Sequence, residues 1–267
     1  LLIMHKFENS WLFQREKIDN LSKNKSIIKK INNSLKKLDQ IRIIDLGTGT
    51  GSNFRYLSKK IKYKNQSWTL MDISKSSLSE AKKNIKINNK IKIIKLKNDD
   101  IIKNIQKHNF TNYDLVTGSA FLDIMPHDWF RKFYQKNKNT KLVYFSINYD
   151  GYFKFYPQHK FDRDVLELFN NDQKSKKNNK TRAVGPECSN IIKSYFSKTH
   201  QSYLFKSNWT DIKNKNFQLM FLDFCEKIIK KNKKNNLLEW LEFRKNNIII
   251  NKSKLSVSNK DFLAIKI

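Results

Sequence analysis

The stretch from Arg42 to Leu57, RIIDLGTGTGSNFRYL, constrains the fold more than any other part of the sequence. The apolar run Ile41 to Leu46 has the length and the β-branched composition of a buried strand. It leads directly into three alternate glycines, Gly47, Gly49 and Gly51. A helix is predicted to follow, from about Asn53 to Ile61. Strand, glycine-rich turn and helix in this order are typical of the first unit of an open α/β sheet, which binds ligands at the carboxyl ends of its strands.

The alternation of strands and helices continues to Tyr149. Further strands are predicted at Ser67–Asp72, Lys90–Lys97, Tyr113–Ala120 and Lys141–Tyr149. Helices are predicted between them, at residues 74–87, just before Tyr113, and at residues 127–135. One or two amphipathic helices are predicted ahead of the first strand, over residues 8–38. This alternation predicts an α/β fold with a parallel sheet covered by helices on both faces.

The alternation ends after Asp150. A polar stretch at residues 174–180 is typical of a mobile loop, and helices are predicted at residues 185–196, 217–231 and 237–246. The segments SYLFKSNW and FLAIKI resemble a closing pair of strands. We therefore expect a helical cap (residues 1–40), a ligand-binding core (41–150), an insert that covers the acceptor side (151–199), and a last part that completes the same domain (200–267).

The residues around the glycines favour a positively charged ligand. A dinucleotide fingerprint reads G-x-G-x-x-G and places a pyrophosphate on the helix N-terminus. Here the third glycine, Gly51, comes one residue early, and Asp45 lies two residues before the first glycine. A carboxylate there would repel a diphosphate but attract an ammonium or sulfonium group, so a nicotinamide reductase is disfavoured.

Acidic residues also end the next two predicted strands. Asp72 ends the second strand, and Asp99 and Asp100 follow the third. The carboxyl ends of parallel strands meet at one edge of the sheet, so these acids are expected to lie close together. Asp72 could also be an ordinary helix cap, because Ser74 and a predicted helix follow it.

The pattern Ile43-Ile44-Asp45-Leu46-Gly47-Thr48-Gly49-Thr50-Gly51 resembles motif one, VxDxGxGxG, of the class I S-adenosylmethionine-dependent methyltransferases. YDLVTGSAFLDI resembles the fourth-strand motif of that family, and the resemblance covers residues 41–149. It implies a Rossmann-like, seven-stranded, mostly parallel sheet with an antiparallel last strand. More loosely, WLFQREKID near the N-terminus and SNW, WLEFR and VSNKDFLAI near the C-terminus resemble small-molecule methyltransferases of proteobacteria.

The resemblance also implies a cofactor, S-adenosyl-L-methionine, and a set of residues that hold it. Backbone at the glycine loop would approach the methionine portion, at Gly47, Thr48, Gly49 and Gly51. Asp45 would orient this loop and hold the ammonium, directly or through water. Asp72 would bind the ribose, and Asp100, or else Asp99, the adenine. Ser119 and Ala120, after the fourth strand, would line the sulfonium and the acceptor.

The acceptor side is less specific. Asp123 and His127 are candidate general bases, although Asp123 could equally cap the next helix and His127 could face solvent in its first turn. Trp11 and Arg15 on the N-terminal helix are candidates to close the acceptor pocket, with Arg15 gripping an acceptor carboxylate, or they could simply pack the helix. Tyr149, at the end of the fifth strand, is a further candidate for the acceptor pocket.

The charge of the chain, +30, raises the question of a nucleic-acid partner. The 47 lysines far outnumber the 7 arginines and are scattered through every segment. Nucleic-acid readers depend on arginine forks, so we favour a solvated lysine-rich surface. We expect a methyltransferase with a small-molecule acceptor. The alternatives are an RNA methyltransferase that uses the lysine surface, and a protein that binds S-adenosylmethionine without catalysis.

The remaining expectations concern location and metals. No apolar run is long enough to span a membrane, no secretory signal is visible, and the two cysteines, Cys188 and Cys225, suit a reducing cytoplasm. No cluster of His, Cys and Asp has metal-ligand spacing, so no metal is expected. We expect the natural start at Met4 or at a non-standard initiation codon. The sequence carries no signal for an oligomeric state.

Overall fold

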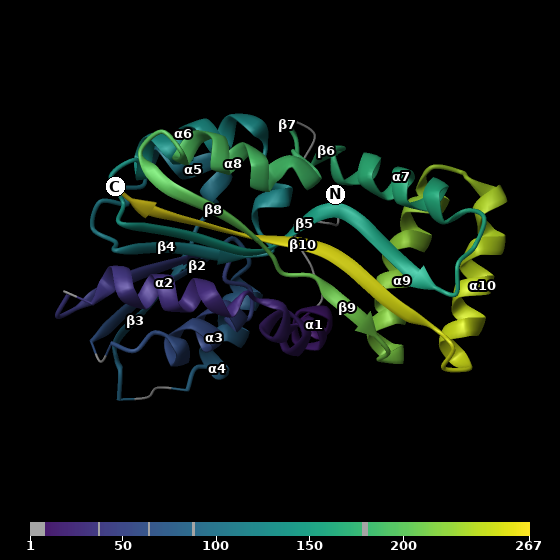
Figure 1. Ribbon diagram of the computed structural model, residues 1–267, viewed down its shortest axis with the longest axis horizontal. Helices are drawn as coiled ribbons and strands as arrows, with labels where there is room; N and C mark the ends of the chain where they lie inside the picture. The colour runs from purple at the N-terminus through teal and green to yellow at the C-terminus, as the bar shows by residue number, and fades with distance from the viewer. Residues whose placement is uncertain (1–8, 37, 64, 87–88, 178–180) are drawn as a thin grey trace.

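The computed structural model describes residues 9–36, 38–63, 65–86, 89–177 and 181–267. In this part of the chain an eight-stranded sheet forms the centre, in the order β3-β2-β1-β4-β5-β10-β8, with β9 paired to β10 (Figure 1). The first five strands in this order are parallel, and β10 is antiparallel to both β5 and β8. The strands are β1 (Ile41–Leu46), β2 (Gln66–Asp72), β3 (Ile91–Asn98), β4 (Leu115–Ser119), β5 (Leu142–Tyr156), β8 (His200–Lys206), β9 (Trp209–Ile212) and β10 (Lys254–Lys266). The predicted α/β, Rossmann-like sheet with an antiparallel last strand is confirmed, and β9 is an additional strand.

Helices cover both faces of this sheet (Figure 1). Side chains of α2 and α3 pack in one buried cluster with one face of the central strands, and side chains of α5, α6 and α8 pack on the other. The helices are α1 (Asn9–Ser22), α2 (Lys25–Leu35), α3 (Ser52–Lys60), α4 (Lys75–Lys83), α5 (Ile101–Asn104), α6 (His127–Asn137), α7 (Asp162–Gln173), α8 (Cys188–Phe196), α9 (Lys215–Lys231) and α10 (Leu238–Ile249).

Strand β1 lies in the middle of the parallel part, between β2 and β4. Ile43 belongs to the cluster with α2 and α3, whereas Ile44 and Leu46 belong to the cluster with α5, α6 and α8. A strand buried on both faces needs apolar side chains in both directions, which is why this run does not alternate with polar residues. The glycine loop that follows is therefore held at the carboxyl edge of a rigid core.

Two helices precede the sheet, separated at Lys23 and Asn24. The break has a local cause, because the Asn24 side chain accepts a hydrogen bond from the Ser26 backbone N–H at 3.0 Å and caps α2. The Asn24 backbone N–H itself donates to Asp261 of β10, also at 3.0 Å. The junction between α1 and α2 is thus attached to the last strand of the sheet.

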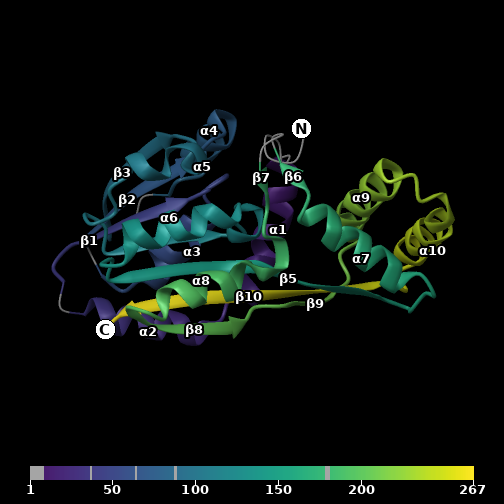
Figure 2. The same ribbon diagram turned by 90° about the horizontal axis from the view of Figure 1, so that it is seen from above.

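Strands β5 and β10 are longer than the sequence predicts. The fifth strand was expected to end at Tyr149, before Gly151, but β5 pairs with β10 as far as Tyr156. Two register shifts in β10 let the pair bend and continue, and Phe153 and Phe155 keep alternating into a third buried cluster. Figure 2 shows the two strands running together past the main sheet towards α7, α9 and α10.

That third cluster forms the core of a C-terminal part built on the β5–β10 extension. It joins α7, α9 and α10 with β9 and with Trp11 of α1. The stretch predicted as a mobile loop, residues 174–180, includes β6 (Lys176–Lys177), which pairs with β7 (Thr181–Arg182). Residues 178–180, Glu8, Ile87 and Met4 lie outside the described part of the chain.

Candidate functional site

The glycine loop between β1 and α3 carries three left-handed residues, with φ of +62° at Gly47, +54° at Gly49 and +84° at Gly51. Side chains strain such a backbone because a Cβ crowds the following carbonyl. At Gly47 a Cβ would also overlap the ring of Phe121, which packs directly on the loop. The loop is therefore bare backbone at its glycines, with Phe121 packed close to Gly47 and Leu12 close to Gly49.

Asp45 lies under this loop and not on its surface. Its side chain is fully buried and accepts hydrogen bonds from Thr48 Oγ1 at 2.6 Å and from Asn53 Nδ2 at 2.8 Å. Burial raises the pKa of the Asp45 carboxyl to about 6, against these two hydrogen bonds, which lower it. Asp45 thus fixes the loop to the first turn of α3, and it is not among the described residues that line the cavity beside the loop.

Asp72 reaches the same loop from the end of β2. Its carboxylate accepts from the Gly49 backbone N–H through Oδ2 and from the Ser74 N–H through Oδ1, both at 2.8 Å. Burial raises the pKa of Asp72, partly offset by these N–H groups. The helix-cap alternative belongs to Ser74, whose Oγ accepts from the Ser77 N–H. Asp72 lies at the edge of the cavity with its carboxylate next to the loop.

Asp99 and Asp100 line the cavity from the end of β3. Asp100 caps α5, because its Oδ1 accepts from the backbone N–H groups of the second and third residues that follow it. Asp99 accepts from Asn104 Nδ2 at 2.7 Å, and His108 Nε2 lies 3.0 Å from its Oδ2. Both acids are held in place by α5 and the turn after it, which explains why two consecutive acids end this strand.

The cavity has a volume of about 390 Å³, within the range usual for small-molecule sites. Four carboxylates and one cation line it among the described residues: Asp19, Asp72, Asp99, Asp100 and Arg15. The cavity is also lined by the glycine-loop residues Gly47, Thr48 and Gly49, and by Ser119, Ala120, Phe121, Ile124 and Met125. The cavity is acidic although the chain as a whole has a net charge of +30. An acidic cavity suits a ligand that carries positive charge.

Ser119, the last residue of β4, and Ala120, which follows it, line the cavity. Ser146 Oγ donates to Ser119 Oγ at 3.0 Å, and the Ala120 N–H donates to the Ser146 carbonyl at 2.8 Å. Ala120 has a φ of +50°, unusual for a residue with a Cβ. The hydrogen bonds to β5 hold this turn, so the cavity wall is shaped by the sheet and not by a free loop.

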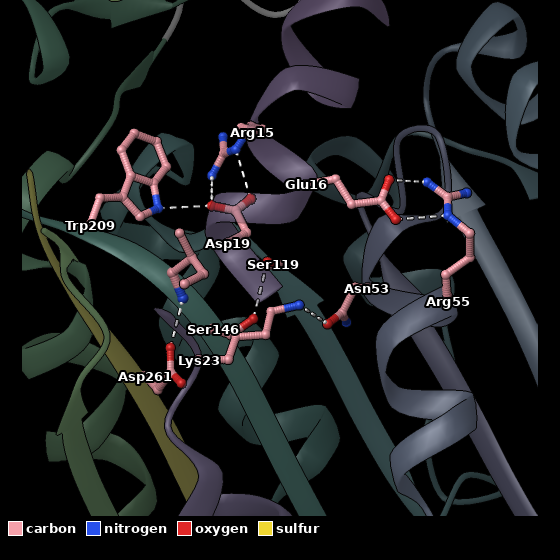
Figure 3. Close-up of polar contacts among 11 residues, drawn as sticks. Arg15, Glu16, Asp19, Lys23, Asn53, Arg55, Ser119, Ser146, Trp209 and Asp261 are labelled. Carbon is pink, nitrogen blue, oxygen red and sulfur yellow. Dashed lines mark hydrogen bonds and ion pairs between the residues drawn. The ribbon is translucent and has the colours of Figure 1, made fainter. Parts of the chain in front are cut away.

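Helix α1 supplies the opposite wall. Leu12, Arg15 and Asp19 line the cavity from one face of the helix. Arg15 Nε donates to Asp19 Oδ2 at 2.8 Å, and Trp209 Nε1 donates to Asp19 Oδ1 at 2.9 Å (Figure 3). On an adjacent side of α1, Glu16 pairs with Arg55 of α3, with 2.9 Å between Oε1 and Nε. The sequence did not point to Leu12 or Asp19, although their spacing from Arg15, three residues before and four after, places them on the same face of the helix.

Five other candidates are not among the described residues that line the cavity: Gly51, which precedes α3, and Trp11, Tyr149, Asp123 and His127. The Trp11 ring stacks on Phe217 with 4.9 Å between centroids. The Tyr149 hydroxyl donates to Asn170 at 2.9 Å. Asp123 lies half-buried in a 3₁₀ turn, and His127 is an exposed first residue of α6. In the described part of the chain, no group of three or more His, Cys, Asp or Glu side chains is placed to hold a metal ion, and no helix has the length and apolarity needed to cross a membrane.

Residues 43–139 match the family model described as a methyltransferase domain. The match begins in β1 and ends after α6, so it includes the glycine loop and the acids that follow β2 and β3. Helix α1 and everything from β5 onward lie outside it. No curated protein matches the chain.

Several solved structures resemble the whole chain. The YcgJ protein of Bacillus subtilis is 13% identical with a TM-score of 0.49, covering 90% of this chain and 97% of that one. The cyclopropane synthase MmaA2 of Mycobacterium tuberculosis is 11% identical with a TM-score of 0.45, covering 89% and 83%. An S-adenosylmethionine-dependent methyltransferase of Geobacter sulfurreducens is 9% identical with a TM-score of 0.43, covering 92% of each chain. The match to the methyltransferase domain, rather than these distant likenesses, bears on function.

Proposed function

We propose that this chain is an S-adenosylmethionine-dependent methyltransferase that acts on a small molecule. The observation that carries the proposal is the charge of the cavity, which holds four carboxylates and one cation in a chain with 54 basic residues. S-adenosylmethionine is a nucleoside with a sulfonium and an ammonium group, so an acidic cavity attracts it and would repel a diphosphate. The match of residues 43–139 to a methyltransferase domain supports the same conclusion.

The residues of the cavity suit each part of this cofactor. Asp72 would accept hydrogen bonds from the ribose hydroxyls, and Asp100, with Asp99 beside it, would accept from the adenine amino group. The backbone at Gly47 and Gly49 would face the amino-acid portion, because both glycines line the cavity and neither carries a side chain. Asp45 would act indirectly, by holding Thr48 and the first turn of α3.

When bound, the cofactor supplies a methyl group on a positively charged sulfur. This chain's residues would then align the acceptor with that methyl group, and alignment of two reactants is worth about 7–11 kcal/mol of the barrier. Ser119 and Ala120 would position the reacting region, and the apolar side chains of Phe121, Ile124 and Met125 would exclude water from it. We assign no proton transfer to Asp123 or His127, because neither lines the cavity, and a base is needed only where the acceptor must lose a proton first.

Calorimetry with four ligands tests the cofactor. S-adenosylmethionine and S-adenosylhomocysteine should bind, whereas NADH and ATP should not, because the cavity acids repel their phosphates. Binding of NADH in preference to the adenosyl compounds would overturn the proposal. Incubation with methyl-labelled S-adenosylmethionine and a fractionated cell extract should then place label in the small-molecule fraction.

The same assay distinguishes the two rival functions. Label that disappears after RNase treatment, together with RNA binding that weakens steeply with added salt, would identify an RNA methyltransferase. Binding of S-adenosylmethionine without transfer of label to any fraction would identify a non-catalytic binding protein. Label in the small-molecule fraction that survives RNase treatment is the outcome expected here.

A further inference from the structure

One face of α1 lies along the glycine loop. At one end, Leu12 Cδ1 is 3.3 Å from the position that a Cβ of Gly49 would occupy. At the other end, Lys23 Nζ donates to Asn53 Oδ1 at 3.1 Å, in the first turn of α3. Arg15 and Asp19 lie on the same face between these two contacts, and both line the cavity (Figure 3). The helix therefore presents an ion pair to the part of the cavity next to the bare loop.

This ion pair is held firmly from behind. Trp209 Nε1 donates to Asp19, and the Arg15 guanidinium lies over the Trp209 ring, 5.2 Å from its centroid. Only 12% of the Arg15 side chain and 7% of the Asp19 side chain are exposed. The pair uses Nε and Nη2 of Arg15, and no described residue accepts a hydrogen bond from Nη1. A charged fork with a donor left over is thus fixed at the cavity wall.

The charges of the cavity wall indicate which group of a ligand would lie beside Arg15. It is the only Lys or Arg among the described residues of the cavity wall, which also carries four carboxylates. A ligand carboxylate would be repelled everywhere in this cavity except beside Arg15. Conversely, Asp45 lies beneath the loop and is not among the described residues of the cavity wall, whereas Asp19 lines the cavity on the same helix face as Leu12, whose side chain lies next to Gly49.

We infer that Arg15 and Asp19 bind the amino-acid end of the methyl donor, Arg15 through the donor's carboxylate and Asp19 through its ammonium. The inference rests on the proposed function, and it extends the donor site to a helix outside the methyltransferase-domain match. The amino-acid end of the donor carries one negative and one positive charge. With its carboxylate beside Arg15 and its ammonium beside Asp19, each of the four charges would lie next to an opposite charge. This placement also gives Nη1 of Arg15 an acceptor, as a bidentate contact with a carboxylate requires.

Three ligands that differ only at this end test the inference by calorimetry: S-adenosylhomocysteine, its decarboxylated analogue, and 5′-methylthioadenosine, which lacks the whole amino-acid end. The wild type should bind S-adenosylhomocysteine most tightly. Arg15→Met keeps an apolar side chain against Trp11 and Trp209. It should weaken the affinity for S-adenosylhomocysteine by about 10- to 100-fold, because charge-assisted hydrogen bonds are lost. The same change should leave 5′-methylthioadenosine within about twofold. Asp19→Asn should weaken both ligands that carry the ammonium and spare 5′-methylthioadenosine.

A matched control on the same helix separates binding from positioning. Lys17→Met removes an exposed cation of α1 that does not line the cavity, so it should change all three affinities by the same factor or not at all. Arg15→Lys, which keeps the charge, should lose less affinity for S-adenosylhomocysteine than Arg15→Met does. Thermal unfolding of each variant checks that it folds.

Several results would overturn the inference. An equal loss of affinity for S-adenosylhomocysteine and 5′-methylthioadenosine in Arg15→Met would make Arg15 a residue that only positions the helix. Unchanged donor affinity with a raised KM for the methyl acceptor would assign Arg15 to the acceptor carboxylate instead. A wild type that binds all three ligands equally would overturn this inference alone, whereas a wild type that binds none would overturn the proposed function as well.

Discussion

Asn53 Nδ2 lies 2.8 Å from Asp45 Oδ1, so the first turn of α3 holds the acid that ends β1. The same amide nitrogen lies 3.2 Å from Thr117 Oγ1 of β4, and Asn53 Oδ1 accepts from Lys23, which follows α1. One buried side chain therefore links β1, β4, α3 and the junction between α1 and α2 directly beneath the glycine loop. Because a partly satisfied buried network is costly, changes at Asn53 or Asp45 should affect the loop as a unit.

The first prediction concerns the pH dependence of stability. The pKa of Asp45 is raised from 3.8 to about 6 by burial, so the folded state holds a proton that the unfolded state has lost between these values. The contribution of Asp45 to the free energy of unfolding is therefore greatest below about pH 4 and is lost as the pH rises through about 6. The expected difference is on the order of 3 kcal/mol, at about 1.4 kcal/mol per pKa unit.

Asp45→Asn removes this titration while keeping an oxygen for Asn53. Urea unfolding of the wild type and the variant from pH 4 to pH 8 measures the effect. The wild type should lose stability relative to the variant as the pH rises through about 6. Parallel pH curves for the two proteins would show that Asp45 does not titrate in this range.

The second prediction concerns Asp72. Asp72→Ala removes the acceptor at the cavity edge and should weaken S-adenosylhomocysteine binding by about 1–3 kcal/mol, the loss of hydrogen bonds to a charged group. Asp72→Asn keeps an acceptor for the Gly49 N–H and should lose less. Asp128→Ala, which removes an exposed acid on α6, serves as the control and should leave affinity unchanged. Calorimetry that gives equal affinities for Asp72→Ala and Asp128→Ala would refute the ribose role.

The third prediction concerns the close approach at Gly47. Gly47→Ala places a Cβ in the ring of Phe121 and strains a left-handed backbone, so it should lower the free energy of unfolding by about 2–5 kcal/mol. Phe121→Leu in the same chain relieves the overlap but not the backbone strain, and should recover part of the loss. Denaturant unfolding of both single variants and the double variant measures the coupling. Strictly additive losses would mean that the ring does not limit this position.

The fourth prediction concerns the C-terminal part. Arg244 of α10 is completely buried and pairs with Asp162 at the start of α7, whose side chain is 31% exposed. Removing one partner of a buried pair costs about 3–5 kcal/mol, so Arg244→Met should destabilise the protein by about 3 kcal/mol, the low end because Asp162 still reaches water. Arg163→Ala, at an exposed pair on α7, should change stability by less than about 0.5 kcal/mol. Thermal unfolding that shows similar losses for both variants would contradict this assignment.

The sequence predicted the sheet well because its signals are local. Buried apolar runs, the alternation with helices and the glycine turn are all readable within a few residues, and parallel strands bring their carboxyl ends to one edge. That geometry is why Asp72, Asp99 and Asp100 could be placed together before their positions were known. The extension of β5 past Gly151 could not be predicted, because it depends on pairing with a strand about a hundred residues away.

The wall formed by α1 was predicted only in part, for a similar reason. Trp11 and Arg15 are one turn apart, yet Trp11 packs in the C-terminal cluster and Arg15 lines the cavity. Helical spacing groups residues by face but does not say what each face meets. The position of Asp19 at the cavity could not be predicted, because Asp19 is held by a hydrogen bond from Trp209, which lies 190 residues later in the chain.

The position of β10 has a consequence for biosynthesis. Of the strands in the described sheet, β10 is the last to leave the ribosome, yet it inserts between β5 and β8 and also pairs with β9. Until it arrives, β5 and β8 each present an unpaired edge, and such edges are templates for aggregation. Nascent chains stalled before Lys254 should therefore depend on chaperones far more than chains that extend past Lys266.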